Sequence, residues 1–357
     1  MASWDGARLV PPLHARIVGL KLERASLKET CRAQALELGI DVCGFSTIAP
    51  ELRRDYYAQW IADGKHGTMG WMERNNDRRL NPESAWPEAK TIVSLGLNYF
   101  QKEPQARGRI SKYALGKDYH KLFYKKLKRL CTWMREQGGN QRPYVDTGPI
   151  LEKPIAVSAG LGWQAKNTLL LNKKFGPYLF LGTIITDLEF EPDPEVKDHC
   201  GRCTKCIDVC PTQAITAPYQ LDARKCIAYL TIEHEGTIPL EFRKAIGNRI
   251  FGCDECLDIC PWVYWAKETR EANFKARPLP DLREMLFWDE ATFDQTFAGT
   301  PIRRSKLHRW KRNICVALGN IGDADDLEAL RNISESENSV IAEHAAWAIA
   351  EIKKRDS

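Results

Sequence analysis

The stretch Cys200-Gly-Arg-Cys203-Thr-Lys-Cys206-Ile-Asp-Val-Cys210-Pro211 has the spacing C-x2-C-x2-C-x3-C-P. Bacterial ferredoxins hold [4Fe–4S] clusters with this spacing, in which three close thiolates bind one cluster and the fourth binds another. A second run, Gly252-Cys253-Asp-Glu-Cys256-Leu-Asp-Ile-Cys260-Pro261, repeats the last three cysteines, but Ile250 occupies the position of the first. This part of the chain therefore predicts a ferredoxin-like module whose second run lacks one ligand.

The missing ligand can come from between the two runs, where Cys226 lies. Each [4Fe–4S] cluster takes four thiolates, and residues 200–260 contain eight cysteines. A structural zinc site is the alternative, because C-x2-C pairs also bind zinc, but zinc explains neither the triple spacing nor the repeated C-x3-C-P. We predict two [4Fe–4S] clusters, one held by Cys200, Cys203, Cys206 and Cys260 and the other by Cys210, Cys226, Cys253 and Cys256.

Length and composition indicate a soluble chain of two or three domains, with 357 residues, 43% hydrophobic and 28% charged. No segment approaches the roughly 18 consecutive apolar residues of a membrane span, so we expect no membrane contact. Residues 1–24 are interrupted by prolines and lack a leader-like apolar core; we expect a flexible extension there. A cytoplasmic location follows as the default, since cluster assembly needs reduced thiols.

The hydrophobic pattern divides the chain into domains. Helix-like and strand-like segments alternate up to residue 190 and predict a domain with a central sheet. Beyond residue 301, three helix-like segments have leucine, isoleucine and alanine patterns of the HEAT type. We predict a multidomain α+β protein: an α/β domain at 25–190, a ferredoxin-like two-cluster domain at 191–265, a connecting segment at 266–300 and a HEAT-like helical domain at 301–357.

The net charge of +5 is modest, but basic residues gather in two blocks, Lys117–Arg129 and Arg303–Arg312. Each block is open to two interpretations, a solvated helix face or a contact with nucleic acid. For the second block, which also contains Trp310, we predict phosphate contacts with nucleic acid through Arg303, Arg304, Lys306, Arg309, Lys311 and Arg312.

Several segments in combination resemble one family, the epoxyqueuosine reductases, which are cobalamin-dependent iron–sulfur enzymes that complete queuosine in tRNA. The resemblance runs from about residue 25 to the end of the chain. Besides the cysteine runs, it rests on Ser111-Lys-Tyr-Ala-Leu-Gly-Lys-Asp-Tyr-His120, Val145-Asp-Thr-Gly-Pro-Ile-Leu-Glu152, Ala159-Gly-Leu-Gly-Trp-Gln-Ala-Lys-Asn167 and Cys226-Ile-Ala-Tyr-Leu-Thr-Ile-Glu233.

The resemblance implies a cofactor and the residues that hold it. The N-terminal domain, of the reductive-dehalogenase or nitroreductase type, would hold cobalamin against the two clusters. No D-x-H-x-x-G motif that presents a histidine to cobalt is found in the sequence. By this resemblance the cobalamin contacts are Arg79, Ser111, Asp146, Leu170, Leu181, Ala228, Cys253 and Asp254.

Asp146 matches the proton donor of the family. From the residues alone, an aspartate in Asp-Thr-Gly-Pro is a turn residue; the resemblance makes it the catalytic acid. A carboxyl group donates a proton near neutral pH only if its pKa lies above the ordinary value of about 3.9. We therefore expect Asp146 to be buried beside Val145, Pro149 and the cobalamin, so that its pKa is raised.

The implied reaction is the two-electron reduction of an epoxide on a tRNA anticodon base to an alkene, with electrons from an external donor. The base would be flipped out of a single-stranded loop, and the enzyme is expected to be a monomer. Two alternatives remain open at this point: a corrinoid iron–sulfur reductase for small molecules, similar to the dehalogenases, and an electron carrier without catalytic activity.

Overall fold

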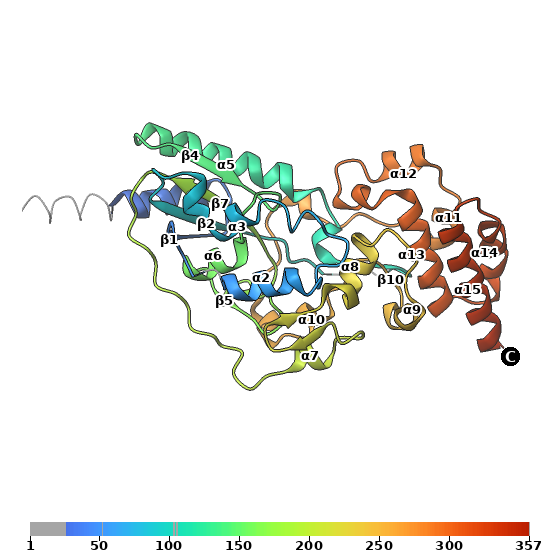
Figure 1. The fold of residues 1–357 in the computed structure, drawn as a ribbon. Helices are drawn as coiled ribbons and strands as arrows, with labels where there is room; N and C mark the ends of the chain where they lie inside the picture. The colour runs from blue at the N-terminus through green and yellow to red at the C-terminus, as the bar shows by residue number, and fades with distance from the viewer. Residues whose placement is uncertain (1–25, 52, 103, 105, 357) are drawn as a thin grey trace, which may run out of the picture.

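The computed structural model describes residues 26–51, 53–102, 104 and 106–356. The flexible extension expected at residues 1–24 lies outside them. From residue 26 the chain is helical to residue 37, and Figure 1 shows the helices and strands that follow. In the part of the chain that is described, no helix has both the length and the apolar content needed to cross a lipid bilayer.

The N-terminal half is built on a four-stranded sheet in the order β1 (Val42–Thr47), β2 (Thr91–Asn98), β7 (Leu179–Thr186) and β4 (Gln141–Tyr144). All three neighbouring pairs run antiparallel. The predicted central sheet with flanking helices is present, but antiparallel pairing places this domain in the α+β class rather than the predicted α/β class.

Both faces of β2 are covered, because every residue of this strand is buried. Alternate side chains point to opposite faces: Val93 and Leu95 pack with Leu127 of α5 (Tyr119–Glu136), whereas Ile92 packs with Ile155 of α6 (Glu152–Ser158). The lysine-rich helix predicted at 117–134 is thus α5, with its apolar side on the sheet. Shorter elements of this half are α2 (Arg54–Ala62), α3 (Asn76–Leu80), α4 (Pro82–Ala85), β5 (Trp163–Gln164) and β6 (Leu170–Leu171).

The cysteine-rich segment is joined to the sheet domain by a parallel pair of short strands, β3 (Arg109–Ile110) and β10 (Arg249–Phe251). Ile250, which stands where a cysteine was expected, is fully buried in the core at this pair. The other elements of the segment are α7 (Lys205–Asp208), β8 (Ile215–Ala217), β9 (Gln220–Leu221), α8 (Ile227–Ile232), α9 (Leu240–Ile246) and α10 (Glu255–Asp258).

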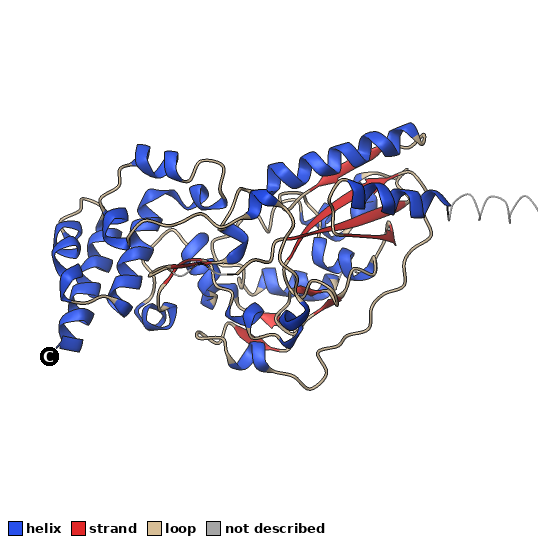
Figure 2. Cartoon of the chain, turned by 180° about the vertical axis from the view of Figure 1, so that it is seen from behind, coloured by secondary structure: helices blue, strands red, loops and turns tan. Residues whose placement is uncertain are grey.

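The C-terminal helices form a layer at one end of the molecule (Figures 1 and 2). The three predicted helices are present as α13 (Lys306–Ile321), α14 (Leu327–Ser334) and α15 (Ser339–Asp356), and they are preceded by α11 (Leu282–Leu286) and α12 (Glu290–Thr296). Helix α13 packs on α15 and also on α8, α9 and β10, so it connects this layer to the cysteine-rich segment.

Two arginines of the second basic block lie inside that contact. Arg312 is fully buried and donates hydrogen bonds to the carbonyl oxygens of Leu230, His234 and Gly236 at 2.7 Å. Arg309 donates to Ile232 O at 3.0 Å, and Trp310 is also fully buried. The prediction that Arg309 and Arg312 bind phosphate, with help from Trp310, is therefore wrong, because these donors are already used inside the protein.

Candidate functional site

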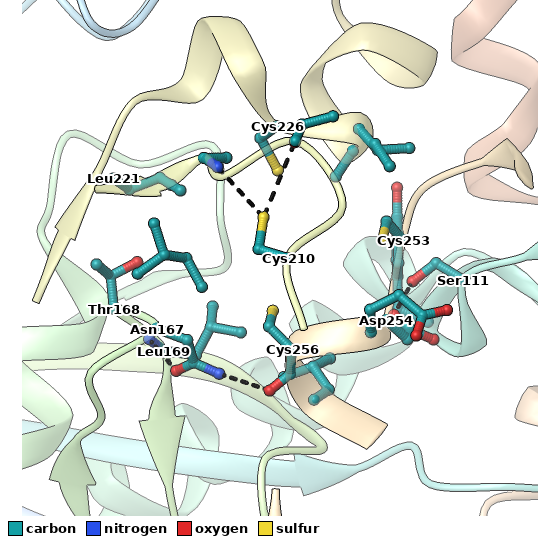
Figure 3. Close-up of a pocket in the computed structure, with 18 of the residues that line it drawn as sticks. Ser111, Asn167, Thr168, Leu169, Cys210, Leu221, Cys226, Cys253, Asp254 and Cys256 are labelled. Carbon is teal, nitrogen blue, oxygen red and sulfur yellow. Dashed lines mark hydrogen bonds between the residues drawn. The ribbon is translucent and has the colours of Figure 1, made fainter. Parts of the chain in front are cut away.

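The eight cysteines of residues 200–260 line two separate cavities. The outer cavity, of about 130 Å³, is lined by Cys200, Cys203, Cys206 and Cys260. The inner cavity, of about 440 Å³ (Figure 3), is lined by Cys210, Cys226, Cys253 and Cys256. The structure thus brings together each of the two predicted sets, and Cys226 takes the place left by Ile250 because the start of α8 carries it to the inner cavity.

The thiols have the surroundings of cluster ligands. Ala214 N donates to Cys210 Sγ at 3.2 Å, and peptide N–H groups at Ala228 and Tyr229 point to Cys226. Burial raises the pKa of Cys206 to about 11 and that of Cys253 to about 12; iron, when bound, would stabilise the thiolate form. Four thiols around an open space suit a cube of iron and sulfur; among the described residues, no three His, Cys, Asp or Glu converge as around a single ion.

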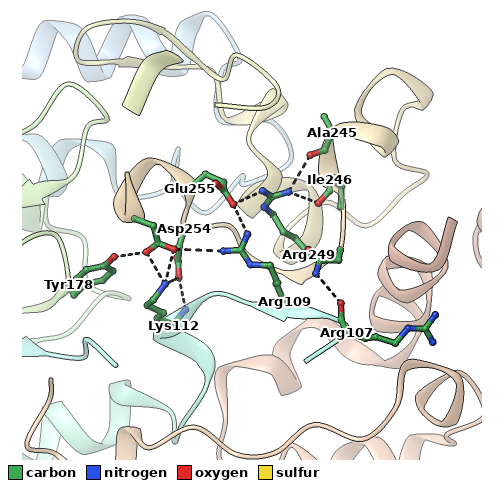
Figure 4. Close-up of polar contacts among 11 residues, drawn as sticks. Arg107, Arg109, Lys112, Tyr178, Ala245, Ile246, Arg249, Asp254 and Glu255 are labelled. Atoms are coloured by element: carbon green, nitrogen blue, oxygen red, sulfur yellow. Dashed lines mark hydrogen bonds and ion pairs between the residues drawn. The ribbon is translucent and has the colours of Figure 1, made fainter. Parts of the chain in front are cut away.

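Helix α10, which carries Cys256, is held in place by ion pairs (Figure 4). Glu255 Oε1 accepts from Arg109 Nη1 at 2.6 Å and from Arg249 Nη2 at 2.5 Å. Lys112 Nζ bonds both carboxylate oxygens of Asp258 at 2.8 Å. Because Arg109 and Lys112 belong to the sheet domain, these pairs fix the inner cysteines relative to it.

The inner cavity extends beyond its cysteines to an apolar wall formed by the sheet domain. At about 440 Å³ it is within the usual size range of ligand sites. Four of the predicted cobalamin contacts line it: Ser111, Ala228, Cys253 and Asp254. Ser111 Oγ donates to Asp254 Oδ1 at 2.5 Å. The lining also includes the aromatic and aliphatic residues Tyr99, Tyr113, Tyr119, Leu169, Leu179 and Phe180.

Three other predicted contacts lie away from the lining. The side chains of Leu170 and Leu181 pack with Ala156 and Leu161 at α6, so only their backbone could face a cofactor. Arg79 is 6% exposed and reaches Gly148 O and Trp71 O at 3.5 Å, while its Nε has no hydrogen-bond partner among the described residues. Buried donors are normally hydrogen-bonded, so this unused donor beside the turn of residues 146–148 is suited to a contact with a bound ligand.

Asp146 lies in that turn, in the left-handed region at φ 58°. Its Oδ2 is 2.7 Å from His120 Nε2, and His120 Nδ1 is 2.6 Å from Asp118 Oδ1. Asp118 in turn accepts from Arg304 Nη2 at 2.8 Å. Arg304 precedes α13, so this line of contacts crosses from the sheet domain to the C-terminal helices.

The described residues alone do not give Asp146 the raised pKa that was expected for it beside cobalamin. Burial does act in that direction, but the hydrogen bond with His120 and the charges of His120 and Arg304 outweigh it and lower this pKa. The side chain is 49% exposed. For His120, burial opposes the charged form, yet hydrogen bonds to Asp118 and Asp146 raise its pKa. The pair therefore consists of an ionised Asp146 and a histidine that holds its proton more firmly than usual.

Family models match the two central parts of the chain. A model described as "4Fe-4S double cluster binding domain" matches residues 199–263, and one described as "Epoxyqueuosine reductase QueG, DUF1730" matches residues 79–147. An epoxyqueuosine reductase of Xanthomonas campestris is 44% identical over 337 residues, covering 90% of this chain and 94% of the relative. The Escherichia coli enzyme is 40% identical over 352 residues, covering 94% and 92%.

The chain belongs to the epoxyqueuosine reductase family.

Solved epoxyqueuosine reductases share the fold. One, determined with an epoxyqueuosine-modified tRNA-Tyr stem loop, superposes with a TM-score of 0.86 at 32% identity over 92% of this chain and 90% of that one. Another, from Bacillus subtilis, has its catalytic loop swung out of the active site; its TM-score is 0.85 at 31% identity, with 92% and 91% covered.

In this member of the epoxyqueuosine reductase family, two titratable residues near Asp146, Glu152 and Lys153, were not among the predicted site residues. Glu152 Oε1 accepts from Asp146 N at 2.9 Å, and burial raises the pKa of Glu152 to about 8. Lys153 lines the inner cavity, where burial lowers its pKa, and it forms no hydrogen bond or ion pair with any described residue. The only sequence signal was their position after the Asp-Thr-Gly-Pro turn.

Proposed function

We propose that this protein reduces epoxyqueuosine to queuosine at the wobble position of tRNA anticodon loops, the last step of queuosine formation. The observation that carries the proposal is the inner cavity, where four cysteines face a ligand-sized space whose wall includes Tyr119 and Lys153. The rings of Tyr119 and His120 lie with their centroids 4.0 Å apart, and His120 Nε2 is 2.7 Å from Asp146 Oδ2. The residue that matches the family's proton donor therefore lies near the edge of a cavity that the predicted cluster ligands also line.

The residues present fit the implied cofactors. Cobalamin would lie in the inner cavity against Ser111, Ala228, Cys253 and Asp254, with Arg79 beside the turn of residues 146–148; when bound, it supplies a strongly reducing cobalt centre. One [4Fe–4S] cluster would be held by Cys200, Cys203, Cys206 and Cys260, and another by Cys210, Cys226, Cys253 and Cys256. Together the two sets would give electrons a route from an external donor to the cavity.

The reaction itself consumes two electrons and two protons. Both C–O bonds of the epoxide break, an alkene forms, and the oxygen leaves as water. The leaving oxygen must be protonated. The pKa of Asp146 is lowered and that of His120 is raised, and His120 Nε2 lies 2.7 Å from Asp146 Oδ2, so a protonated His120 can pass a proton to Asp146. When the bound nucleoside excludes water, charge separation between them becomes more costly, and the proton moves to Asp146 Oδ2 and on to the substrate oxygen.

The RNA would lie across the sheet domain and the C-terminal helices. Exposed cations on this side are Arg303, Arg304 and Lys306, with Lys311 half-buried, and a second group lines a groove on α5 formed by Lys121, Lys125, Lys128 and Arg129. Helices α13, α14 and α15 would act as a HEAT-like RNA-binding layer. We infer that the enzyme works as a monomer in the cytoplasm.

An anaerobic assay on tRNA that carries the epoxide, read by mass spectrometry of the nucleosides, tests this function. The enzyme with both clusters and cobalamin should convert epoxyqueuosine to queuosine. Asp146→Asn should bind the cofactors normally, by iron content and corrin absorbance, and lose at least about a hundredfold in turnover. Normal turnover in this variant would remove Asp146 from the mechanism, and no conversion by the unaltered enzyme would overturn the function.

A further inference from the structure

Exposed aromatic and aliphatic side chains lie next to the outer cysteine cavity. Tyr264 is 86% exposed, Trp265 52% and Ile259 39%. They flank Cys260 in the sequence, which lines that cavity. Large apolar side chains gathered on one surface usually mark a site where another molecule docks.

A row of aromatic rings links this surface to the cavity. Trp262 lines the outer cavity, its ring centroid is 5.1 Å from that of Trp265, and Trp265 is 5.3 Å from Tyr264. On its inner side Trp262 also meets Trp163 at 4.9 Å. A molecule that covered Tyr264 and Trp265 would therefore stand close to the thiols of the outer set.

The rim of this surface is mainly basic. Arg202 lies between Cys200 and Cys203, and Lys205 lines the cavity itself. Lys267 follows the aromatic residues, and Lys173 belongs to the turn closed by Gly176, which approaches Trp262. All four are exposed and have no acidic partner among the residues described. Of the nearby acids, Glu268 is paired with Lys102 and Asp198 is bonded to Tyr219; Asp208 is exposed and has no cationic partner in the described chain.

The position of the surface separates it from the proposed RNA side. In Figures 1 and 2, α7 and α10 lie at the bottom of the molecule and α5 lies at the top. Arg304 contacts Asp118 at the start of α5, so the proposed RNA contacts and the outer cavity are on different sides. An electron donor could occupy one side while RNA occupies the other.

We propose that the surface formed by Ile259, Tyr264 and Trp265, with its rim of Arg202, Lys205, Lys267 and Lys173, docks a small acidic protein that carries single electrons. The inference rests on the proposed function, which requires an external donor. At each docking the carrier is oxidised by one electron and the outer cluster is reduced by one; no covalent bond forms or breaks. Two dockings supply the two electrons that one epoxide consumes.

The test compares a protein donor with a small one, in the absence of RNA. Cluster reduction is followed by stopped-flow absorbance in the cobalamin- and cluster-loaded enzyme, with either an acidic reduced ferredoxin or dithionite. The double variant Tyr264→Ala/Trp265→Ala and, separately, Lys267→Glu should each lower the second-order rate with ferredoxin by at least about tenfold. Dithionite should reduce these variants at the unaltered rate, because it needs no docking surface.

Matched controls are Phe287→Ala, which removes an aromatic residue that is 56% exposed near α11, and Lys90→Glu, which reverses the charge of an exposed lysine just before β2; both should keep the ferredoxin rate. Equal iron content in all variants shows that the clusters are intact, and Lys267→Glu tests the surface even if the double variant loses iron. Unchanged ferredoxin rates in Lys267→Glu, or a dimer that the same substitutions dissociate, would overturn the proposal. Because RNA is absent, this result is independent of whether epoxyqueuosine is the substrate.

Discussion

At the scale of single residues, His120 determines the charge of Asp146. Replacing His120 with Gln keeps a hydrogen-bonding group but removes the proton on Nε2, so turnover should fall by about ten- to a hundredfold. Because the pKa of His120 is raised, the wild-type rate should be highest below that pKa and fall as the pH increases through it. His120→Gln should lack this decline, which a pH series of single-turnover rates would reveal.

His308→Gln on α13 is the matched control and should keep both rate and pH profile. If His120→Gln showed the wild-type decline at high pH, the titrating group would be elsewhere. Glu152 is then the first alternative, since burial raises its pKa to about 8 and its carboxyl accepts from Asp146 N.

The residues of the site differ in how far the sequence could predict them. The spacing of the eight cysteines predicted the same two sets that line the two cavities, because a cluster requires its ligands at short, fixed separations along the chain. The environment of Asp146 could not be predicted in this way, because His120 is 26 residues away in the chain and Arg304 is 184 residues from His120. A pKa depends on charges that only the tertiary structure brings together.

At the scale of elements, α15 is anchored by a neutral histidine. His344 is fully buried; its Nε2 accepts from Ile238 N at 3.1 Å, and its Nδ1 lies 2.6 Å from Val340 O. Burial lowers the pKa of His344 to about 4. Below about pH 6.5 this histidine is protonated in the unfolded chain but stays neutral in the folded one. The free energy of unfolding therefore decreases as the pH drops toward 4, by about 3 kcal/mol in total.

Thermal unfolding measured between pH 7 and pH 5.5 checks this prediction. The wild type should lose more in Tm over this interval than His344→Asn, whose amide oxygen can accept from Ile238 N but does not titrate. An equal loss in the two proteins would show that His344 is not the group responsible.

The positions of the helices along the chain were predicted more reliably than the contacts that they make in the structure. The apolar periodicity located α5 and α13 to within a few residues, since burial of one face is visible in the pattern. It could not show that Arg309 and Arg312 point inward, because arginines that bind carbonyl oxygens and arginines that face water have the same sequence spacing. Nor did the order of elements reveal that all pairs of the main sheet run antiparallel.

At the scale of the whole molecule, the charges on the RNA side predict a salt-dependent association. The logarithm of the association constant for an anticodon stem loop should decrease linearly with the logarithm of the salt concentration, with a slope of about −0.7 for each phosphate contact. Arg304→Gln should reduce the slope by about one contact, whereas Arg331→Gln, on the exposed side of α14, should leave it unchanged. Fluorescence anisotropy at several salt concentrations measures the slope for each variant. Weak binding without salt dependence would favour a reductase of small molecules.

The buried Arg312 has a consequence for how the protein matures. Three carbonyl oxygens in the segment that follows Cys226 are satisfied by this one side chain, which lies more than 80 residues further along the chain than Cys226. While the ribosome is still making α13, the loop that brings Cys226 to its place has no such support. We therefore expect the inner set to take up iron only after α13 has packed on α8, so that assembly of the inner set follows the folding of the C-terminal helices.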